Sequence, residues 1–479
     1  MSIIAVVLGY FALLFAFSRW TGRRATNETF YKADRQSPWY LVAFGMIGAS
    51  ISGITFVSVP GMVLTSQMTY LQTCMGFILG YAVVAFLLLP LYYRMNLISI
   101  YTFLGQRLGP RSHQTGSWFF LLSKMTGAAV KFYVVCIILQ RFVFQQLGIP
   151  FAATACSLVL LIWLYTRRGG IKTLVWTDSL QTLCLFTALF LIIYKVMTDL
   201  DYSWEEMTVA IIHNELSRVF VWDDWLSTQN FWKQFVSGAF IVIVMTGLDQ
   251  DMMQKNLTCK TLRGAQKDMC CYGAAFLPTN LLFLSLGVLL TLWYQQRGLP
   301  LPTTPDDLLP QYISLTSHLS LLTTVFVLGI VAASFSSADS ALTSMTTIFC
   351  VDIIKRPTDE RLRKSTHFVM CLLFVGFILL FRMSNSISLI DAIYILVGYT
   401  YGPLLGLFAF ALLTKRRVAD RWVPWIAIFS PALCWMLDSA AGRWMGYHFG
   451  YELLMLNGLL TFAGLWVTTC IDSPQEPSS

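Results

Sequence analysis

Apolar residues fill long runs along nearly the whole chain, and short polar segments separate these runs. Each run spans roughly 18 to 30 residues, which is enough for a helix to cross about 30 Å of hydrocarbon. The pattern therefore predicts about thirteen membrane-spanning helices. They lie near residues 2–19, 39–63, 70–93, 115–146, 150–166, 173–198, 231–249, 269–296, 320–352, 366–382, 386–413, 422–440 and 448–471.

The composition supports an all-α polytopic membrane protein. Of the 479 residues, 56% are hydrophobic, 15% are aromatic and only 12% are charged, which excludes an ordinary soluble domain. The net charge of +8 lies in the loops. No basic groove with interleaved aromatic residues accompanies it, so we expect contact with anionic membrane lipid and no nucleic acid. No obligatory protein partner is expected.

The distribution of Lys and Arg predicts how the chain is oriented. Short cytoplasmic loops accumulate these residues, whereas external loops do not. We therefore expect a plasma (inner) membrane protein with its N-terminus outside, its C-terminus in the cytoplasm and its acidic loop 199–230 outside. The basic loops, all predicted to be cytoplasmic, lie near 19–35, 94–111, 167–172, 255–267, 355–364 and 415–421.

The order of the spans predicts two halves of opposite orientation. Residues 39–198 and 231–413 would each hold five helices, and an odd number of crossings turns the second half over. Residues 1–38 add one helix and a loop in front, and residues 414–479 add two helices and a short cytoplasmic tail. Such a five-plus-five inverted repeat places its site at the midplane, where the first helix of each half is broken.

Both of these first helices contain residues that favour a break. The first carries GMIGASISGIT, in which Gly45, Gly48 and Gly53 interrupt the apolar run. The other carries VMTGLDQD, with Gly247 and Asp249. Small residues also allow ordinary close packing of helices, so each segment alone leaves that alternative open.

The segment AASFSSADSALTS, from Ala332 to Ser344, puts hydroxyls and a carboxylate inside an apolar helix. Hard oxygen ligands suit small cations, and ionisable groups within a span usually face a polar path. The segment thus predicts a cation site, although small residues also serve helix packing. At about 100° per residue one face collects Ala333, Ser336, Ser337, Ser340 and Ser344, flanked by Asp339 and Thr343.

Three further charged residues lie within predicted spans. Asp178 is two turns inside its span, which favours an ion ligand over a helix cap. Lys124 is near enough to a span end for its ammonium to reach the membrane surface. Lys131 is too deep for that and needs a buried anion, either a carboxylate such as Asp391 or an acidic group of a substrate.

No catalytic set is present in the sequence. The five His lie in loops or at span ends, and no HExxH, GxSxG or phosphate-binding glycine loop occurs. The 11 Cys are dispersed and lack the spacing of metal ligands. We therefore expect a transporter and not an enzyme.

Several motifs together resemble the sodium/solute symporters, which include sodium/sialic acid, sodium/glucose and sodium/proline cotransporters. They are GASISGITF, GGIKTLVWTDSLQ, GLDQDMMQKNL, AASFSSADSALTS and GYTYGPLLGL. The resemblance covers nearly the whole chain. It implies the leucine-transporter-type inverted repeat and import of a small polar solute with Na+ by alternating access.

The resemblance also implies where sodium binds. One ion would lie between the broken first helix and the Ser-rich helix, and some members hold a second ion at the aspartate that corresponds to Asp178. Asp339 stands where sialic acid transporters have a Ser, and its charge would strengthen the second site or admit a proton. The first site would comprise Gly48, Ile51, Ala333, Ser336 and Ser337, and the second Asp178, Ser336, Asp339 and Ser340.

The same resemblance indicates solute contacts. The hydroxyls near the first break match those of sialic acid transporters, but Gly127 stands where these have the arginine that binds the carboxylate. Lys131, one turn further on, would replace it and favour an acidic sugar such as sialic acid. The predicted solute contacts are Ser50, Ser52, Thr55, Gln72 and Lys131.

Two alternatives remain open, a sodium/neutral sugar symporter and a transporter-like membrane sensor.

The charges also predict how many ions are transported. Two carboxylates, Asp178 and Asp339, near one hydroxyl face are hard to bury with a single cation, so we expect two sodium ions per cycle.

Overall fold

A computed structural model of the protein describes residues 3–23, 25–316, 320–383, 389–447 and 449–471. Within these ranges the chain is helical, and the only β-type pairing is an isolated bridge between Ser37 and Cys259. Seven helices are long and apolar enough to cross a membrane, two more spans consist of bent helix pairs, and four apolar helices are shorter. The thirteen predicted spans therefore all correspond to helices, while residues 472–479 lie outside the described ranges.

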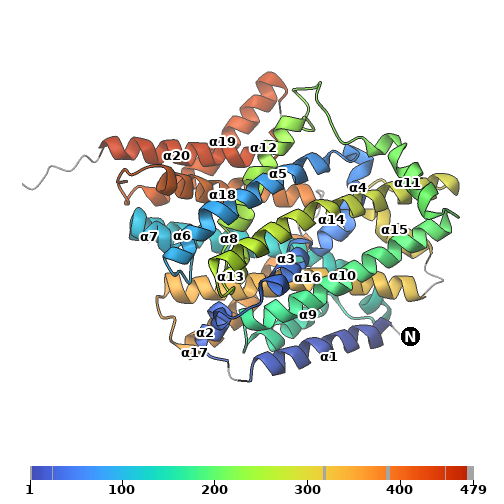
Figure 1. Ribbon diagram of the computed structural model, residues 1–479, viewed down its shortest axis with the longest axis horizontal. Coiled ribbons are helices and arrows are strands. Elements are labelled where there is room, and N and C mark those ends of the chain that lie inside the picture. Colours follow the sequence, from blue (N-terminus) through green and yellow to red (C-terminus); the bar gives the residue numbers. More distant parts are fainter. Residues whose placement is uncertain (1–2, 24, 317–319, 384–388, 448, 472–479) are drawn as a thin grey trace, which may run out of the picture.

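Figure 1 shows the helices that form the spans, and their bounds lie close to those predicted from the apolar runs. Short helices that the sequence did not predict lie in the connections, namely α2 (Asn27–Lys32), α7 (Thr102–Arg107), α11 (Trp204–Ile212) and α15 (Leu308–Leu315). The spans are α1 (Ile3–Thr21), α3 with α4 (Trp39–Ser50, Gly53–Ser66), α5 to α6 (Tyr70–Arg94), α8 (Pro110–Leu139), α9 (Phe151–Thr166), α10 (Ile171–Asp199), α12 with α13 (Phe231–Val242, Gln250–Asn256), α14 (Leu262–Gln296), α16 (Ser320–Ile348), α17 (Glu360–Met383), α18 (Leu389–Leu413), α19 (Val423–Met445) and α20 (Leu453–Ile471).

Both predicted breaks are confirmed. Helices α3 and α4 meet at 61°, and the segment Phe231–Gly247 meets α13 at 68°. Extended backbone causes each bend, at Ile51 and Ser52 in the first case and at Asp249 in the second. The first helix of each five-helix half is thus interrupted, as the inverted repeat requires.

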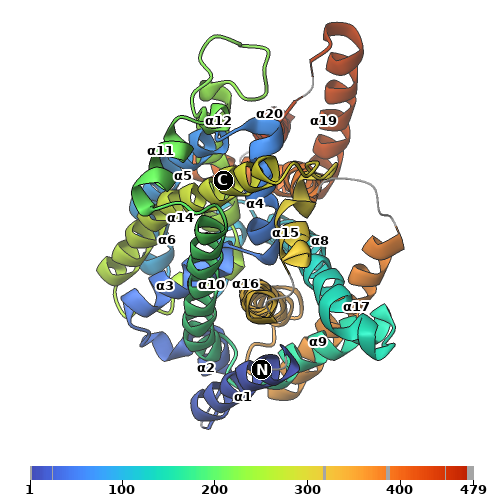
Figure 2. The same cartoon turned by 90° about the vertical axis from the view of Figure 1, so that its right-hand side faces the viewer.

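Helix α16 lies at the centre of the bundle (Figure 2). It packs against α1, α3, α4, α8, α9, α10 and α17. Every residue from 329 to 348 is buried, which includes the whole polar segment Ala332–Ser344. The hydroxyls and the carboxylate of this segment therefore face protein and not the lipid.

The basic loops contact one another. Asn27 Nδ2 donates to the Pro357 carbonyl at 2.9 Å, and Arg363 Nη1 donates to the Arg167 carbonyl at 3.1 Å. Arg107 likewise donates to the Thr414 carbonyl. The first two contacts join three of the basic loops, and the third joins the loop of Arg107 to Thr414, just before another. Figure 1 shows α2 and α7 at the opposite end of the bundle from α11 and α15.

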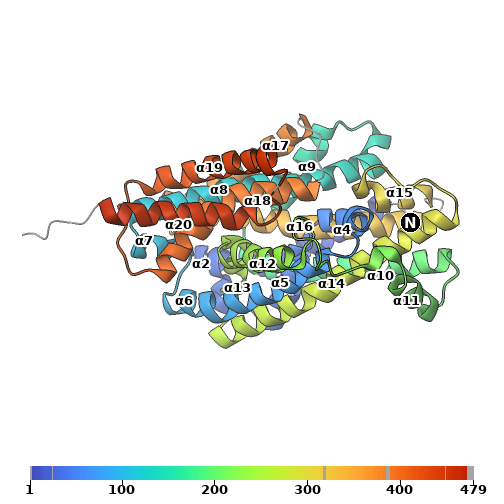
Figure 3. The same ribbon diagram turned by 90° about the horizontal axis from the view of Figure 1, so that it is seen from above.

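Helices α19 and α20 lie along the edge of the bundle (Figure 3). Large apolar side chains cover the outer surface of α19. This face has the character of a lipid-facing surface. Its exposed members include Trp425, Ile428, Phe429, Leu433, Trp435 and Met436.

Candidate ion and solute site

A cavity of about 150 Å³ lies between the two broken spans. Helices α5, α8, α14, α16 and α18 complete its wall. Both breaks contribute to this cavity, as expected for the site of an inverted repeat. Its polar lining residues are Ser50, Ser52, Thr55, Tyr70, Tyr81, Ser123, Lys124, Lys131, Thr246, Asp249, Asp251, Tyr272, Ser337 and Tyr401.

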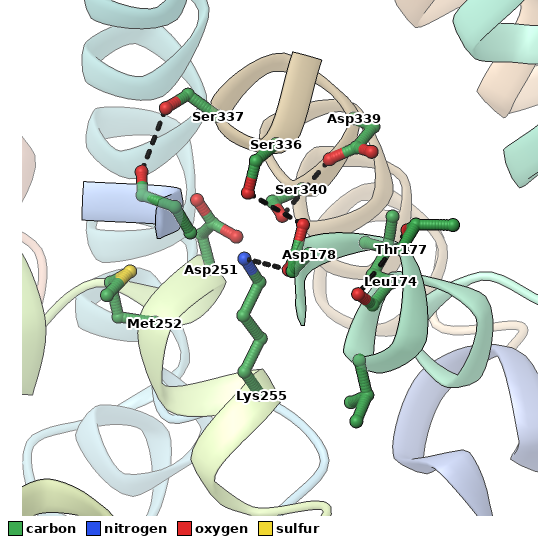
Figure 4. A network of polar contacts seen from close by, with 12 residues as sticks. Leu174, Thr177, Asp178, Asp251, Met252, Lys255, Ser336, Ser337, Asp339 and Ser340 are labelled. Carbon is green, nitrogen blue, oxygen red and sulfur yellow. Dashed lines mark hydrogen bonds and ion pairs between the residues drawn. The ribbon is translucent and has the colours of Figure 1, made fainter. Parts of the chain in front are cut away.

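Helix α16 bridges the first break. The Gly53 amide, at the start of α4, donates to Ser334 Oγ at 3.1 Å. Ser337 Oγ donates to the carbonyl of Ala49, near the end of α3, at 2.8 Å (Figure 4). A helix break leaves amides and carbonyls without partners, and here two serines one turn apart supply them.

The residues predicted for the first sodium site divide into two groups. Ser337 and Ala333 lie beside the break, where the Ala333 carbonyl accepts from Ser337 Oγ at 3.4 Å. Gly48 lies on α3 just before it, and a Cβ there would be 2.0 Å from Thr182 Oγ1, so only glycine fits. Ile51 supplies the extended backbone of the break. Ser336 instead points away from the break, toward α10.

Ser336 joins a buried polar cluster around Asp178. Ser336 Oγ donates to Asp178 Oδ1 at 2.7 Å, and Lys255 Nζ lies 2.7 Å from Asp178 Oδ2 (Figure 4). Asp178 and Lys255 are each 1% exposed. The charge pattern predicts Lys255 in a cytoplasmic loop. This prediction is wrong, because α13 places this lysine in the protein core against a carboxylate.

Asp339 lies in the same cluster and is fully buried. Tyr165 Oη donates to its Oδ2 at 2.5 Å, and Ser340 Oγ donates to its Oδ1 at 3.3 Å. The structure therefore brings all four residues predicted for the second sodium site together, and adds Lys255 and Tyr165 to them.

The second break is built from charged side chains. The Asp249 side chain caps α13 by accepting from the Asp251 amide at 2.8 Å. Lys124 Nζ on α8 lies 3.1 Å from Asp249 Oδ2 and 2.7 Å from Asp251 Oδ2. Tyr401 Oη on α18 donates to Asp249 Oδ2 at 2.6 Å. The prediction that Lys124 extends to the membrane surface is wrong, since its ammonium pairs with two buried carboxylates.

Four of the five predicted solute contacts line the cavity. Ser50, Ser52, Thr55 and Lys131 do so. Gln72 does not: its Nε2 donates to the Gln229 carbonyl at 2.9 Å, and its Oε1 accepts from the Val221 amide. Gln72 thus holds the loop between α11 and α12.

Lys131 is half-buried and lines the cavity. Among the residues whose side chains the structure describes, no carboxylate forms an ion pair with it. The side chain of Asp391, its predicted alternative partner, lies outside the described residues. An added Cβ at Gly127, one turn before Lys131, would meet nothing within 4 Å, so this wall of the cavity is open.

Sequence reasoning missed the tyrosines of the cavity. Tyr272 Oη lies 2.5 Å from Ser50 Oγ and accepts from Tyr81 Oη at 2.9 Å. A tyrosine in an apolar helix has no local signal that distinguishes a core ring from a lining hydroxyl. Asp251 and Lys255 can be recognised from the sequence. They carry opposite charges and lie four residues apart, so they indicate a charged face of one helix.

Comparisons with known proteins agree on one family. The model of the sodium:solute symporter family matches residues 30–420. The chain is 25% identical over 453 residues to the sodium/sialic acid symporter NanT of Aliivibrio fischeri, covering 92% of this chain and 88% of that protein. It is 24% identical to the sodium/sialic acid symporter SiaT of Proteus mirabilis, covering 88% and 87%.

Two solved structures share the fold. A Na+-coupled sialic acid symporter in a substrate-bound outward-open state superposes with a TM-score of 0.84 at 22% identity, covering 99% of this chain and 98% of that one. The nucleobase-cation symporter Mhp1 superposes with a TM-score of 0.57 at 15% identity, covering 95% and 96%. The predicted family and the predicted leucine-transporter-type fold are therefore confirmed.

Proposed function

Because this chain belongs to the sodium:solute symporter family, we propose that it imports a small acidic solute together with Na+ and that Lys131 binds the acidic group. The named relatives that transport sialic acid support an acidic sugar as the solute class. The family consists of transporters, which agrees with the absence of a catalytic motif in the sequence.

The observation that carries this proposal is the contrast among three lysines of the core. Lys124 and Lys255 each contact carboxylates of the protein, at 2.7 Å in both cases. Lys131 has no such partner among the described side chains, and it lines the cavity. A half-buried ammonium without a counter-charge is costly, so an anionic group in the cavity gains binding energy by neutralising it.

The first sodium ion of the proposal binds at the α3/α4 break. Carbonyl oxygens near Gly48 and Ile51, the Ala333 carbonyl and the Ser337 hydroxyl supply hard oxygen ligands there. Because Ser337 also lines the solute cavity, bound sodium would lie next to the solute and stabilise an acidic group electrostatically. Binding of either one then favours binding of the other.

We further propose the orientation that the loops suggest. The basic loops would face the cytoplasm and the acidic connection between α10 and α12 would lie outside, with the N-terminus outside and the C-terminus inside. The apolar face of α19 supports direct contact with membrane lipid.

A neutral sugar is the second candidate, and the hydroxyls of Ser50, Tyr81 and Tyr272 favour it. A thermal-shift screen of acidic sugars, neutral sugars and amino acids, with and without sodium, identifies the solute class. Stabilisation by an acidic solute that requires sodium supports the proposal.

Uptake into proteoliposomes then tests Lys131. We expect Lys131→Met to abolish uptake of the acidic solute and Lys131→Arg, the matched control, to retain part of it, because only arginine keeps the positive charge. Full uptake by the Met variant would show that Lys131 does not bind the solute.

A further inference from the structure

The solute site leaves Lys255 unexplained. Its ammonium comes from α13 and contacts Asp178 on α10 (Figure 4). The sequence predicts that Asp178 binds a second sodium ion. The ammonium therefore occupies a carboxylate oxygen that this ion would need, and it carries the same charge.

The other carboxylate oxygens of the predicted second site also have donors. Asp178 Oδ1 accepts from Ser336, and both oxygens of Asp339 accept hydroxyl donors, from Tyr165 and from Ser340. A cation entering this cluster would have to break the contact between Lys255 and Asp178. It would also leave a second positive charge beside it.

We propose that Lys255 is a tethered cation that takes the place of the second sodium ion, so that transport is coupled to one sodium ion at the first site. This inference rests on the proposed function, and it replaces the two-ion stoichiometry predicted from the sequence. Asp178 then holds a fixed ammonium and does not bind a transported ion.

Burial explains why sodium does not displace this ammonium. Lys255 is held on α13 within reach of Asp178, whereas sodium must arrive from solution. Sodium binding would make two cations share Asp178, because Asp251 already pairs with Lys124 and both oxygens of Asp339 already accept hydroxyl donors. The tethered cation therefore has the advantage at any ordinary sodium concentration.

The position of the pair gives it a structural role as well. Helix α10 closes the first five-helix half, and α13 belongs to the broken span that opens the second half. The contact between Lys255 and Asp178 thus joins the two halves with a charge that stays in the protein throughout the cycle. A sodium ion at this place would leave with the solute.

Sodium binding to the purified full-length protein tests the inference without a solute. The protein is titrated with sodium chloride at constant ionic strength, with N-methylglucamine as the replacing cation, and tryptophan fluorescence or thermal stability is recorded. We expect a Hill coefficient near one for the wild type and for Lys255→Arg, the matched control. We expect a coefficient approaching two for Lys255→Met, because Asp178 then becomes available to a second sodium ion that binds cooperatively with the first.

The double variant Asp178→Asn/Lys255→Gln keeps the test valid if Lys255→Met does not fold. Removing both charges should leave the sodium coefficient and half-saturation within about twofold of the wild type. A wild-type coefficient near two, or a more than tenfold loss of sodium affinity in the double variant, overturns the inference. An unchanged coefficient of one in folded Lys255→Met does so too. Absence of any sodium response would instead contradict the proposed function.

Discussion

At the α3/α4 break the groups that bridge the gap are an amide, a carbonyl and two serine hydroxyls, whereas at the break before α13 they are mainly charged. Ser334 and Ser337 complete the first break. Asp249 and Asp251 form the second, and the single ammonium of Lys124 contacts both. The same interruption of a membrane helix thus has two different solutions in the two halves of one bundle.

The difference supports the proposal that a sodium ion exchanges at the first break. A hydrogen bond between neutral groups contributes little net free energy, so a sodium ion can replace it and leave again at low energetic cost. Separating a carboxylate from a buried ammonium costs much more free energy, because it leaves uncompensated charges in the core. The first break is therefore suited to a transported cation, and the second to a permanent joint between α8, α13 and α18.

The largest effect should follow from removing the charge that holds the second break. Lys124→Met leaves Asp249 and Asp251 without their cation, and we expect a loss of roughly 3–5 kcal/mol in the free energy of unfolding. Unfolding by sodium dodecyl sulfate in mixed micelles measures it. Tyr401→Phe, which removes one hydrogen bond to Asp249 and no charge, is the matched control and should cost only about 1 kcal/mol.

A loss below about 1 kcal/mol in Lys124→Met would remove the distinction between the two breaks. The second break would then tolerate the loss of its charge as easily as the first break tolerates a missing hydroxyl.

A smaller effect, on sodium and not on stability, is expected at the first break. Ser337→Ala should raise the sodium concentration for half-maximal uptake about tenfold, which corresponds to about 1.4 kcal/mol. Uptake against sodium concentration at saturating solute measures it. Ser344→Ala is the control, because its hydroxyl bonds only to a carbonyl of its own helix. Equal half-activation in both variants would rule out Ser337 as an ion ligand.

An effect of similar size, on stability and not on sodium, should come from the other serine of the same break. Ser334→Ala leaves the buried Gly53 amide without its acceptor, and we expect about 1–2 kcal/mol less stability with little change in sodium half-activation. The same unfolding assay and the same uptake curve measure the two quantities. A sodium effect as large as that of Ser337→Ala would mean that both serines act on the ion.

The spans and breaks could be predicted because they depend on local properties. Apolar runs set the positions of the helices, and the interruptions at Gly48 and Gly247 mark the two broken helices. The short connecting helices could not be predicted, because they contain too few residues to show the helical periodicity of apolar positions. The sequence also does not predict the hydrogen bonds of Gln72, since its partners Val221 and Gln229 are far away along the chain.

Charged partners were harder to predict than charged positions. Asp178 and Lys131 were recognised as unusual because each lies deep in an apolar run. The cluster of basic residues around Lys255 predicts a loop, whereas the bend at Asp249 carries this lysine back into the core. The choice of partner depends on how α8, α10 and α13 cross, which one sequence does not contain.

The glycines of α3 have a mechanical consequence. A Cβ at Gly48 would lie 2.0 Å from Thr182 Oγ1, and a Cβ at Gly45 would lie 3.0 Å from Asp178 Cβ, so α3 rests directly on α10. Two helices in such close contact cannot shift along each other unless their backbones first separate. We therefore expect α3 and α10 to move together, with the extended residues 51–52 as the joint between α3 and α4.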